Sequence, residues 1–234
     1  MYTETSALPL SFDSLKTDRI SHIAETHMRP YVKLLSSLVA SLFIFCLVTT
    51  AQAAPTSRQV LEGTIDHVLQ LLADPAFANP ATTKAQRARI EVEVRKVFDF
   101  EEFSARTAGQ RWRSFTRDQQ KRFAEAFAQL LISTYLGQLK DYNGEKVAYV
   151  SERANAKGTR VEQLTNLKLS DGRTIPVAYR MMAKNGSWVV YDVLVEGVSL
   201  VKNYRTQFQD ILATDSPDDL IARIEQKARE PKAK

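Results

Sequence analysis

The sequence predicts an α+β fold in which a four-stranded antiparallel meander sheet packs against several helices. Apolar residues recur at helical spacing from residue 56 to about residue 143, and the period changes to two between residues 147 and 195. Helical spacing then returns after residue 199. No linker separates these stretches, so residues 54–234 are expected to form a single domain.

The N-terminal segment is interpreted as an export signal that is removed. Arg29 and Lys33 precede an apolar run over residues 34–48, and Ala51-Gln52-Ala53 supplies a small-x-small motif. This order predicts cleavage after Ala53. The alternative is an uncleaved membrane anchor, but the run is short for a spanning helix.

Two other features belong to the same segment. Met28 begins a signal of ordinary shape, and residues 1–27 are polar and without pattern, so we interpret them as a spurious upstream extension. Cys46, the only cysteine, lies inside the apolar run, and the bulky residues 43–45 before it do not suit a lipid-attachment signal. The mature chain therefore has no disulfide and depends on its hydrophobic core.

Helices are expected first in the mature chain. One runs from Thr56 or Ser57 to Asp74, where Pro75 ends it, and another is centred on residues 90–97. The apolar positions of the first helix are Leu61, Ile65, Val68 and Leu72.

Capping signals place two further helices. Asp99 precedes a short helix that Gly109 closes. Thr116 and Gln119 form a capping box for the longest helix, which is expected to end near Asn143-Gly144.

Four strands follow, with period two, over residues 147–151, 161–169, 175–181 and 189–195. Asp171-Gly172 and Asn185-Gly186 are hairpin signals, so neighbouring strands are expected to be antiparallel. Pro176 indicates a strand end or an edge strand.

Two helices close the chain. Ser199 precedes the first, and Ser216-Pro217 supplies an N-cap and a first-turn proline for the second.

Catalytic and metal-binding machinery is not visible in the mature sequence. Its one histidine, His67, falls on the polar side of a helix, and no Cys or phosphate-binding glycine motif accompanies it. Asp192 and Glu196 share a strand face at roughly 13 Å, too far apart for the roughly 5–9.5 Å of glycosidase carboxylates. We expect Asp192 to be a buried acid bonded to a neighbouring helix. The protein is therefore predicted not to be an enzyme.

Charge excludes a typical nucleic-acid binder. Residues 1–53 carry four basic and four acidic side chains, so the net charge of +5 is unchanged by their removal. Both signs are interleaved along the mature chain, without a basic stripe or tail.

Two stretches carry a family resemblance. VFDFEEFSARTAGQRWRSFTRDQQKRFAEAFAQLLISTYLGQL and WVVYDVLVEGVSLVKNYRTQF resemble the periplasmic phospholipid-binding proteins of the Mla (maintenance of lipid asymmetry), or toluene-tolerance, transport system. The similarity covers roughly residues 57–230 and is loose over 56–90. The N-terminal extension departs from the family pattern.

The resemblance implies a periplasmic shuttle with phospholipid as cargo and no cofactor. A shuttle gains nothing obvious from oligomerising, so a monomer is expected. The resemblance also implies exchange with an inner-membrane ATP-binding-cassette transporter, through that transporter's membrane-anchored substrate-binding ring, and with an outer-membrane lipoprotein–porin complex. Such a carrier needs an apolar lipid cleft between sheet and helices, because both acyl chains must be shielded from water.

The expected lipid-binding residues fall on two walls of that cleft. The strand wall consists of Val147, Tyr149, Val177, Tyr179, Met181, Val189, Tyr191, Val193 and Val195. The helix wall consists of Phe98, Phe103, Phe123, Phe127, Leu131, Tyr135, Tyr204 and Phe208. An error of one residue in register would turn the strand residues to the other face. Lys202 and Arg205 are candidates for headgroup contact, with solvated charges or partner contacts as the alternatives.

Two other hypotheses remain open at this point. A periplasmic interaction or scaffold protein would have a filled core and no bound lipid. A hydrolase would depend on Asp192 and would lose activity in Asp192→Asn.

Overall fold

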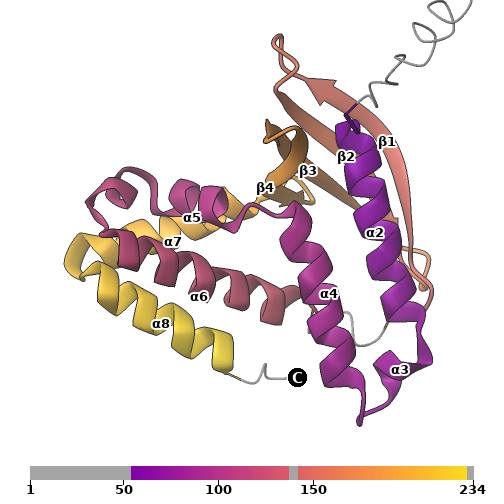
Figure 1. Cartoon of the computed structure of the whole chain (residues 1–234), viewed down its shortest axis with the longest axis horizontal. Helices are drawn as coiled ribbons and strands as arrows, with labels where there is room; N and C mark the ends of the chain where they lie inside the picture. The colour runs from indigo at the N-terminus through magenta and orange to yellow at the C-terminus, as the bar shows by residue number, and fades with distance from the viewer. Residues whose placement is uncertain (1–53, 137–141, 231–234) are drawn as a thin grey trace, which may run out of the picture. The chain divides into compact units, whose positions relative to one another are not determined.

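The computed structural model describes residues 54–136 and 142–230, which belong to one compact unit. Within this part of the chain, seven α-helices, one 3-10 helix and five strands follow in the order helices, sheet, helices (Figure 1). The predicted α+β class is confirmed. The expected signal segment, with Met28 and Cys46, lies outside the described residues. The longest helix was expected to end near Asn143-Gly144; these two residues are not helical, and residues 137–141 before them lie outside the described part of the chain.

The first predicted helix forms over the expected residues, and a short helix that was not predicted follows it. Helix α2 (Ser57–Ala73) begins at a capping box in which Thr56 and Gln59 satisfy each other's backbone N–H groups. Asp74 then accepts a hydrogen bond from the Ala76 N–H at 2.8 Å and starts the short helix α3 (Pro75–Ala78). Pro75 therefore follows the end of α2 and is the first residue of α3. Helix α4 (Thr83–Val97) comes next.

The middle helices follow the predicted caps as well. Asp99 caps α5 (Phe100–Ala108), and Gly109 ends it with a φ of 61° that favours glycine. The 3-10 helix η1 (Gly109–Ser114) leads to α6 (Arg117–Leu136). The capping box of Thr116 and Gln119 is present at the start of α6.

The sheet is a meander of antiparallel strands in sequence order. Its strands are β1 (Lys146–Ala154), β2 (Arg160–Lys168), β3 (Thr174–Lys184), β4 (Ser187–Val195) and the short β5 (Val198–Ser199). Asn185 and Gly186 both have positive φ, so the twist of the turn between β3 and β4 matches the right-handed twist of the two strands. Pro176 lies near the start of β3, an inner strand, so its strand-end interpretation holds and its edge interpretation does not. The two-residue β5 was not predicted.

A β-bulge in β4 sets which side chains face the helices. Arg180 pairs with Asp192 and the next residue of β3, Met181, pairs with Val190, so Tyr191 is the extra residue. Val190 and Val193 therefore share the inner face, although they are three residues apart. Tyr191 and Asp192 lie opposite Arg180 on the outer face.

Asp192 joins the sheet to the helix that follows it. Its carboxylate accepts hydrogen bonds from Ser199 Oγ at 2.7 Å and from the Val201 N–H at 3.1 Å, at the start of α7 (Leu200–Thr214). Arg180 Nη1 lies 3.1 Å from the same carboxylate. The predicted bond from a buried Asp192 to a neighbouring helix is confirmed.

Helices occupy two regions beside the sheet (Figure 1). Helices α2 and α4 run side by side, and Leu61 and Val97 pack on the inner face of β3 and β4. The second group is formed by α5, α6, α7 and α8 (Pro217–Arg229), which share an aromatic core. The sheet, with α2 and α4 packed on its inner face, therefore forms one part of the fold, and the four later helices form another.

Replacing Asp192 with alanine is predicted to lower the free energy of unfolding by about 1.5–3 kcal/mol, because hydrogen bonds to a buried charged group are lost. Urea denaturation monitored by circular dichroism measures this change. The matched control is Asp210→Ala, at an exposed position of α7, which should change stability by less than about 0.5 kcal/mol. Equal effects of the two substitutions would contradict the assigned role.

Candidate functional site

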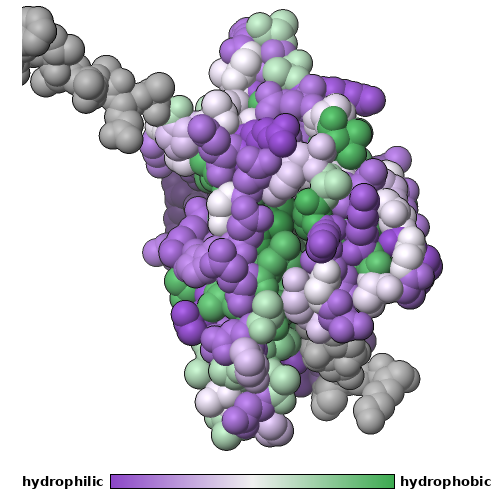
Figure 2. Space-filling view, turned by 90° about the vertical axis from the view of Figure 1, so that its right-hand side faces the viewer, coloured by the Kyte–Doolittle hydropathy of each residue, from purple (hydrophilic) through white to green (hydrophobic). Residues whose placement is uncertain are grey.

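An apolar cleft of about 320 Å³ lies between the inner face of the sheet and helices α2, α4 and α6. Figure 2 shows a band of hydrophobic residues between hydrophilic margins on the face that carries α2 and β1. Many lining side chains are half-buried, because they face the cleft and do not interlock with one another. This concave, apolar shape is typical of a small-molecule site.

Two helices that the sequence did not assign to the site supply much of the lining. From α2 come Leu61, Thr64, Ile65, Val68, Leu69 and Leu72, and from α4 come Ile90, Glu91, Val94 and Val97. Among these residues, Thr64 and Glu91 are polar, and Glu91 is held by an ion pair with Arg95 at 2.8 Å. The helical spacing of apolar residues over 61–72 was the only sign in the sequence that this helix could line a cleft. The same spacing is equally typical of a helix that packs on a filled core.

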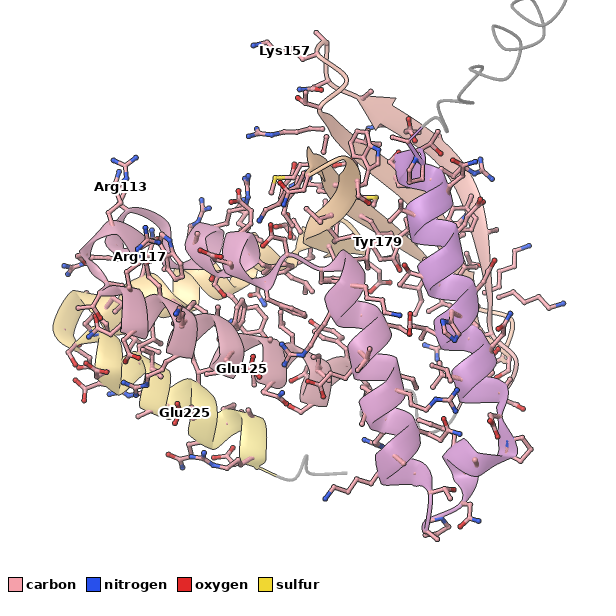
Figure 3. All side chains as sticks on the ribbon, viewed as in Figure 1. Arg113, Arg117, Glu125, Lys157, Tyr179 and Glu225 are labelled. Atoms are coloured by element: carbon pink, nitrogen blue, oxygen red, sulfur yellow. The ribbon has the colours of Figure 1, made fainter. Side chains whose placement is uncertain are left out.

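Nine of the residues expected to bind lipid line the cleft. They are Phe98, Phe103, Leu131, Tyr135, Val147, Val177, Tyr179, Val193 and Val195. Figure 3 labels Tyr179 on the sheet beside α2 and α4. Phe100, Ile132, Leu136, Leu167 and Leu200 complete the lining without having been predicted.

Four of the expected aromatic residues lie elsewhere. Phe123, Phe127, Tyr204 and Phe208 pack against one another with ring centroids 4.9–5.9 Å apart. They form the aromatic core between α6 and α7. The reason is the length of α6: its first half packs in the second group of helices, and only its last turns, with Leu131 and Tyr135, reach the cleft. The prediction that these four rings belong to the helix wall of the cleft was wrong.

The four remaining residues of the expected strand wall lie on different faces of the sheet. Met181 and Tyr149 are on the inner face and pack with the core beside the cleft. Val189 pairs with Met182 on the outer face, and Tyr191 is the bulged residue, with the Arg106 guanidinium 4.1 Å from its ring centroid. The inward orientation predicted for Val189 and Tyr191 was wrong, because the bulge shifts the alternation by one residue.

The two basic residues proposed for headgroup contact are not among the residues that line the cleft. Arg205 Nε donates to the Arg106 carbonyl at 2.7 Å and thereby holds α7 against the end of α5. Lys202 is exposed in the first turn of α7. Arg205 therefore has a structural role that the sequence did not indicate.

The described residues show no group of His, Cys, Asp or Glu arranged to hold a metal ion. No helix among them is long and apolar enough to span a membrane. The acid considered for catalysis, Asp192, is instead engaged by Ser199, Val201 and Arg180.

The sequence profile described as MlaC protein matches residues 62–226, about 70% of the chain. This chain belongs to the MlaC family. The resemblance noted in the sequence is thereby confirmed.

Individual relatives agree with this assignment. An intermembrane phospholipid transport system binding protein, MlaC, of Haemophilus influenzae is 26% identical over 79% of this chain and 88% of its own length. The toluene tolerance protein ttg2D of Pseudomonas putida is 29% identical over 45% of this chain and 49% of its own length.

A solved structure of the phospholipid-binding protein from Ralstonia solanacearum, in complex with a phospholipid, matches this fold with a TM-score of 0.66. The two chains are 25% identical, and the match covers 74% of this chain and 97% of the Ralstonia chain. The architecture around the cleft is therefore an MlaC architecture.

Tyrosines around the MlaC cleft and the aromatic core are hard to ionise. Burial raises the pKa of Tyr179 to about 12. Burial raises the pKa of Tyr149 further, helped by the nearby carboxylates of Asp66 and Glu62. Burial also raises the pKa of Tyr204 to about 12. Each phenol is thus neutral at physiological pH and able to donate a hydrogen bond.

These raised pKa values predict a loss of stability in alkali. In the unfolded chain a tyrosine ionises near pH 10, whereas Tyr179 keeps its proton in the folded protein up to about pH 12. The contribution of Tyr179 to stability is full below pH 10 and declines between pH 10 and 12. Urea denaturation at pH 8, 10 and 11 should show this decline, and Tyr179→Phe should make it shallower. Identical pH dependence in wild type and Tyr179→Phe would contradict the prediction.

Proposed function

We propose that this chain is a phospholipid carrier that holds acyl chains in the cleft between the sheet and helices α2, α4 and α6. The observation that supports it most is the apolar lining of the cleft, found in a fold that matches a phospholipid-bound relative over 97% of that relative's chain. Because the lining supplies apolar contacts and few fixed charges, the carrier recognises the tails of its cargo.

The energetics of lipid transfer explain why such a cleft is needed. A two-chain lipid exposes about thirty methylenes to water at roughly 0.8 kcal/mol each, on the order of 20 kcal/mol in total. Lining residues such as Ile65, Val68 and Val177 replace that contact with water. Transfer in the cleft requires binding and release, and no catalytic group takes part.

We infer the route of transport from family membership. The Haemophilus relative belongs to an intermembrane phospholipid transport system. We infer that this chain acts as a monomer in the periplasm and exchanges lipid with an inner-membrane ATP-binding-cassette transporter through its membrane-anchored ring. The proposed second partner is an outer-membrane lipoprotein–porin complex.

Extraction of the purified protein with organic solvent, followed by mass spectrometry, tests the proposal. We expect near-stoichiometric phospholipid in the wild type. Val193→Gln should reduce it, because an unpaired amide in the cleft costs roughly 1–3 kcal/mol, equivalent to about 5- to 150-fold in affinity. The matched control is Val189→Gln on the outer face of the same strand, which should keep wild-type loading. A lipid-free extract from folded wild-type protein would contradict the carrier function and favour a scaffold role.

Export of the chain gives a separate prediction. We expect the mature protein to begin at Ala54, because the small-x-small motif ends at Ala53. Intact-mass measurement on protein isolated from the whole cell envelope, periplasm and membranes together, checks this position. A mass that includes residues 28–53 would instead indicate an uncleaved anchor.

A further inference from the structure

The two faces of the sheet differ in their chemistry. The inner face is apolar and lines the cleft through residues such as Val147 and Leu167. Side chains alternate along a strand, so the adjacent residues, Lys146 and Lys168, point to the outer face. These two lysines lie directly opposite each other on β1 and β2.

Further basic side chains lie on the outer face of β1 and β2. Arg153 of β1 lies opposite Glu162, and Arg160 is two residues from Glu162 on β2, so the two arginines are diagonal neighbours. Lys157 belongs to the turn between the strands, and Figure 3 shows it at the tip of this hairpin, away from the helices. We name the cationic face by its five basic residues, which are Lys146, Arg153, Lys157, Arg160 and Lys168.

Acidic side chains do not neutralise the cationic face. Its five basic side chains are exposed and form no ion pair among the described residues. Glu162, the one acid at the outward positions of β1 and β2, is paired with Arg180 of β3 at 2.9 Å. Five basic side chains and one acid give these positions a net charge of +4, compared with +5 for the whole chain. A charge nearly equal to that of the whole protein is therefore gathered on one hairpin.

Repulsion within the cationic face works against the pairing of its strands. Like charges directly opposite each other in a sheet are destabilising, and Lys146 and Lys168 form such a pair. Arg153 and Arg160 repeat the arrangement diagonally near the other end of the hairpin. Anions bound at both ends would relieve this repulsion.

Apolar side chains lie between the two ends of the cationic face. Leu164, Ala178 and Leu194 are aligned across β2, β3 and β4 and are half-buried. None of the three belongs to a core cluster of the described residues. Val150, the bulged residue of β1, is exposed on the adjacent strand. Basic residues around accessible apolar side chains are typical of surfaces that bind at a lipid–water interface.

We propose that the cationic face docks on the surface of an anionic phospholipid bilayer. From Arg160 to Lys168, the two ends of β2, the face extends about 27 Å at the usual rise of a strand. This length is about three times the Debye length of about 8 Å at physiological ionic strength, so the two ends interact with separate anions. A bilayer with anionic headgroups supplies anions over the whole area. An acidic protein partner would need carboxylates matched to both ends.

Docking through the cationic face places the cleft beside the membrane. The edge strand β1 carries Lys146 on the cationic face and Val147 in the lining of the cleft. Figure 2 shows the hydrophobic band on the side of the molecule that carries α2 and β1. A bilayer in contact with β1 is therefore next to this band.

Flotation of the purified protein with lipid vesicles tests the docking. One set of vesicles contains phosphatidylcholine alone, and the other contains equal parts of phosphatidylcholine and phosphatidylglycerol. We expect binding to the second set only. This binding should be lost when the salt is raised from about 0.1 M to about 1 M, because the Debye length falls from about 10 Å to about 3 Å.

Charge reversal at either end of the cationic face should weaken binding to the anionic vesicles. Lys157→Glu combined with Arg160→Glu is expected to raise the lipid concentration for half-maximal binding about 25-fold or more, because each basic residue near an anionic surface contributes about fivefold. Lys146→Glu combined with Lys168→Glu, at the other end, should have a similar effect. Circular dichroism verifies that each variant is folded.

The matched control is Arg117→Glu combined with Lys121→Glu. It changes the net charge by the same amount at two exposed positions of α6 that form no ion pair among the described residues, and it should keep wild-type binding. An equal loss in the control would assign the effect to overall charge and overturn the role of this face. Binding that persists at high salt would overturn it as well. Absence of binding to both sets of vesicles overturns membrane docking and leaves an acidic protein as the partner.

This proposal and the carrier function fail separately. Flotation measures docking whether or not the cleft holds lipid, whereas solvent extraction measures lipid in the cleft without vesicles. Folded protein that yields phospholipid on extraction but does not float would keep the carrier function and lose the docking face.

Discussion

The bulge in β4 is the constraint on which the rest of this structure depends. It turns Tyr191 and Asp192 together to the outer face, where Asp192 accepts a hydrogen bond from the Val201 N–H in the first turn of α7 and pairs with Arg180. The Val190 carbonyl at the same point accepts a hydrogen bond from the Asp99 N–H at 3.0 Å. That bond holds the junction of α4 and α5 against the sheet, so one irregularity positions three helices and leaves Val193 facing the cleft.

Stability and ligand space are located in different parts of the fold. The aromatic core of Phe123, Phe127, Tyr204 and Phe208 is closely packed and lies among α5 to α8. The cleft is bounded instead by half-buried aliphatic side chains of α2 and the sheet. A cavity in the main core would lower the free energy of unfolding by several kcal/mol. The cleft avoids this cost because it lies outside the aromatic core, which stays fully packed.

Much of the fold was predictable because its signals are local. Capping boxes at Thr56 and Thr116, and the Asn185-Gly186 turn, act within a few residues. The strand wall was predicted in part. Its errors are Val189 and Tyr191, at a bulge that no residue pattern in the sequence indicates. The helix wall was predicted least well, because an apolar stripe on α2 has the same period whether it faces a core or a cavity.

The separate aromatic core also affects how the protein tolerates sequence change. Substitutions among Ile65, Val68 and Val177 alter the shape of the cleft, while the rings that hold α6 and α7 together stay in place. Substitutions in the lining can therefore change which lipids are bound, with little loss in the free energy of unfolding. The same scaffold is a practical starting point for engineering carriers of other amphiphiles, with α2 and β3 as the positions to randomise.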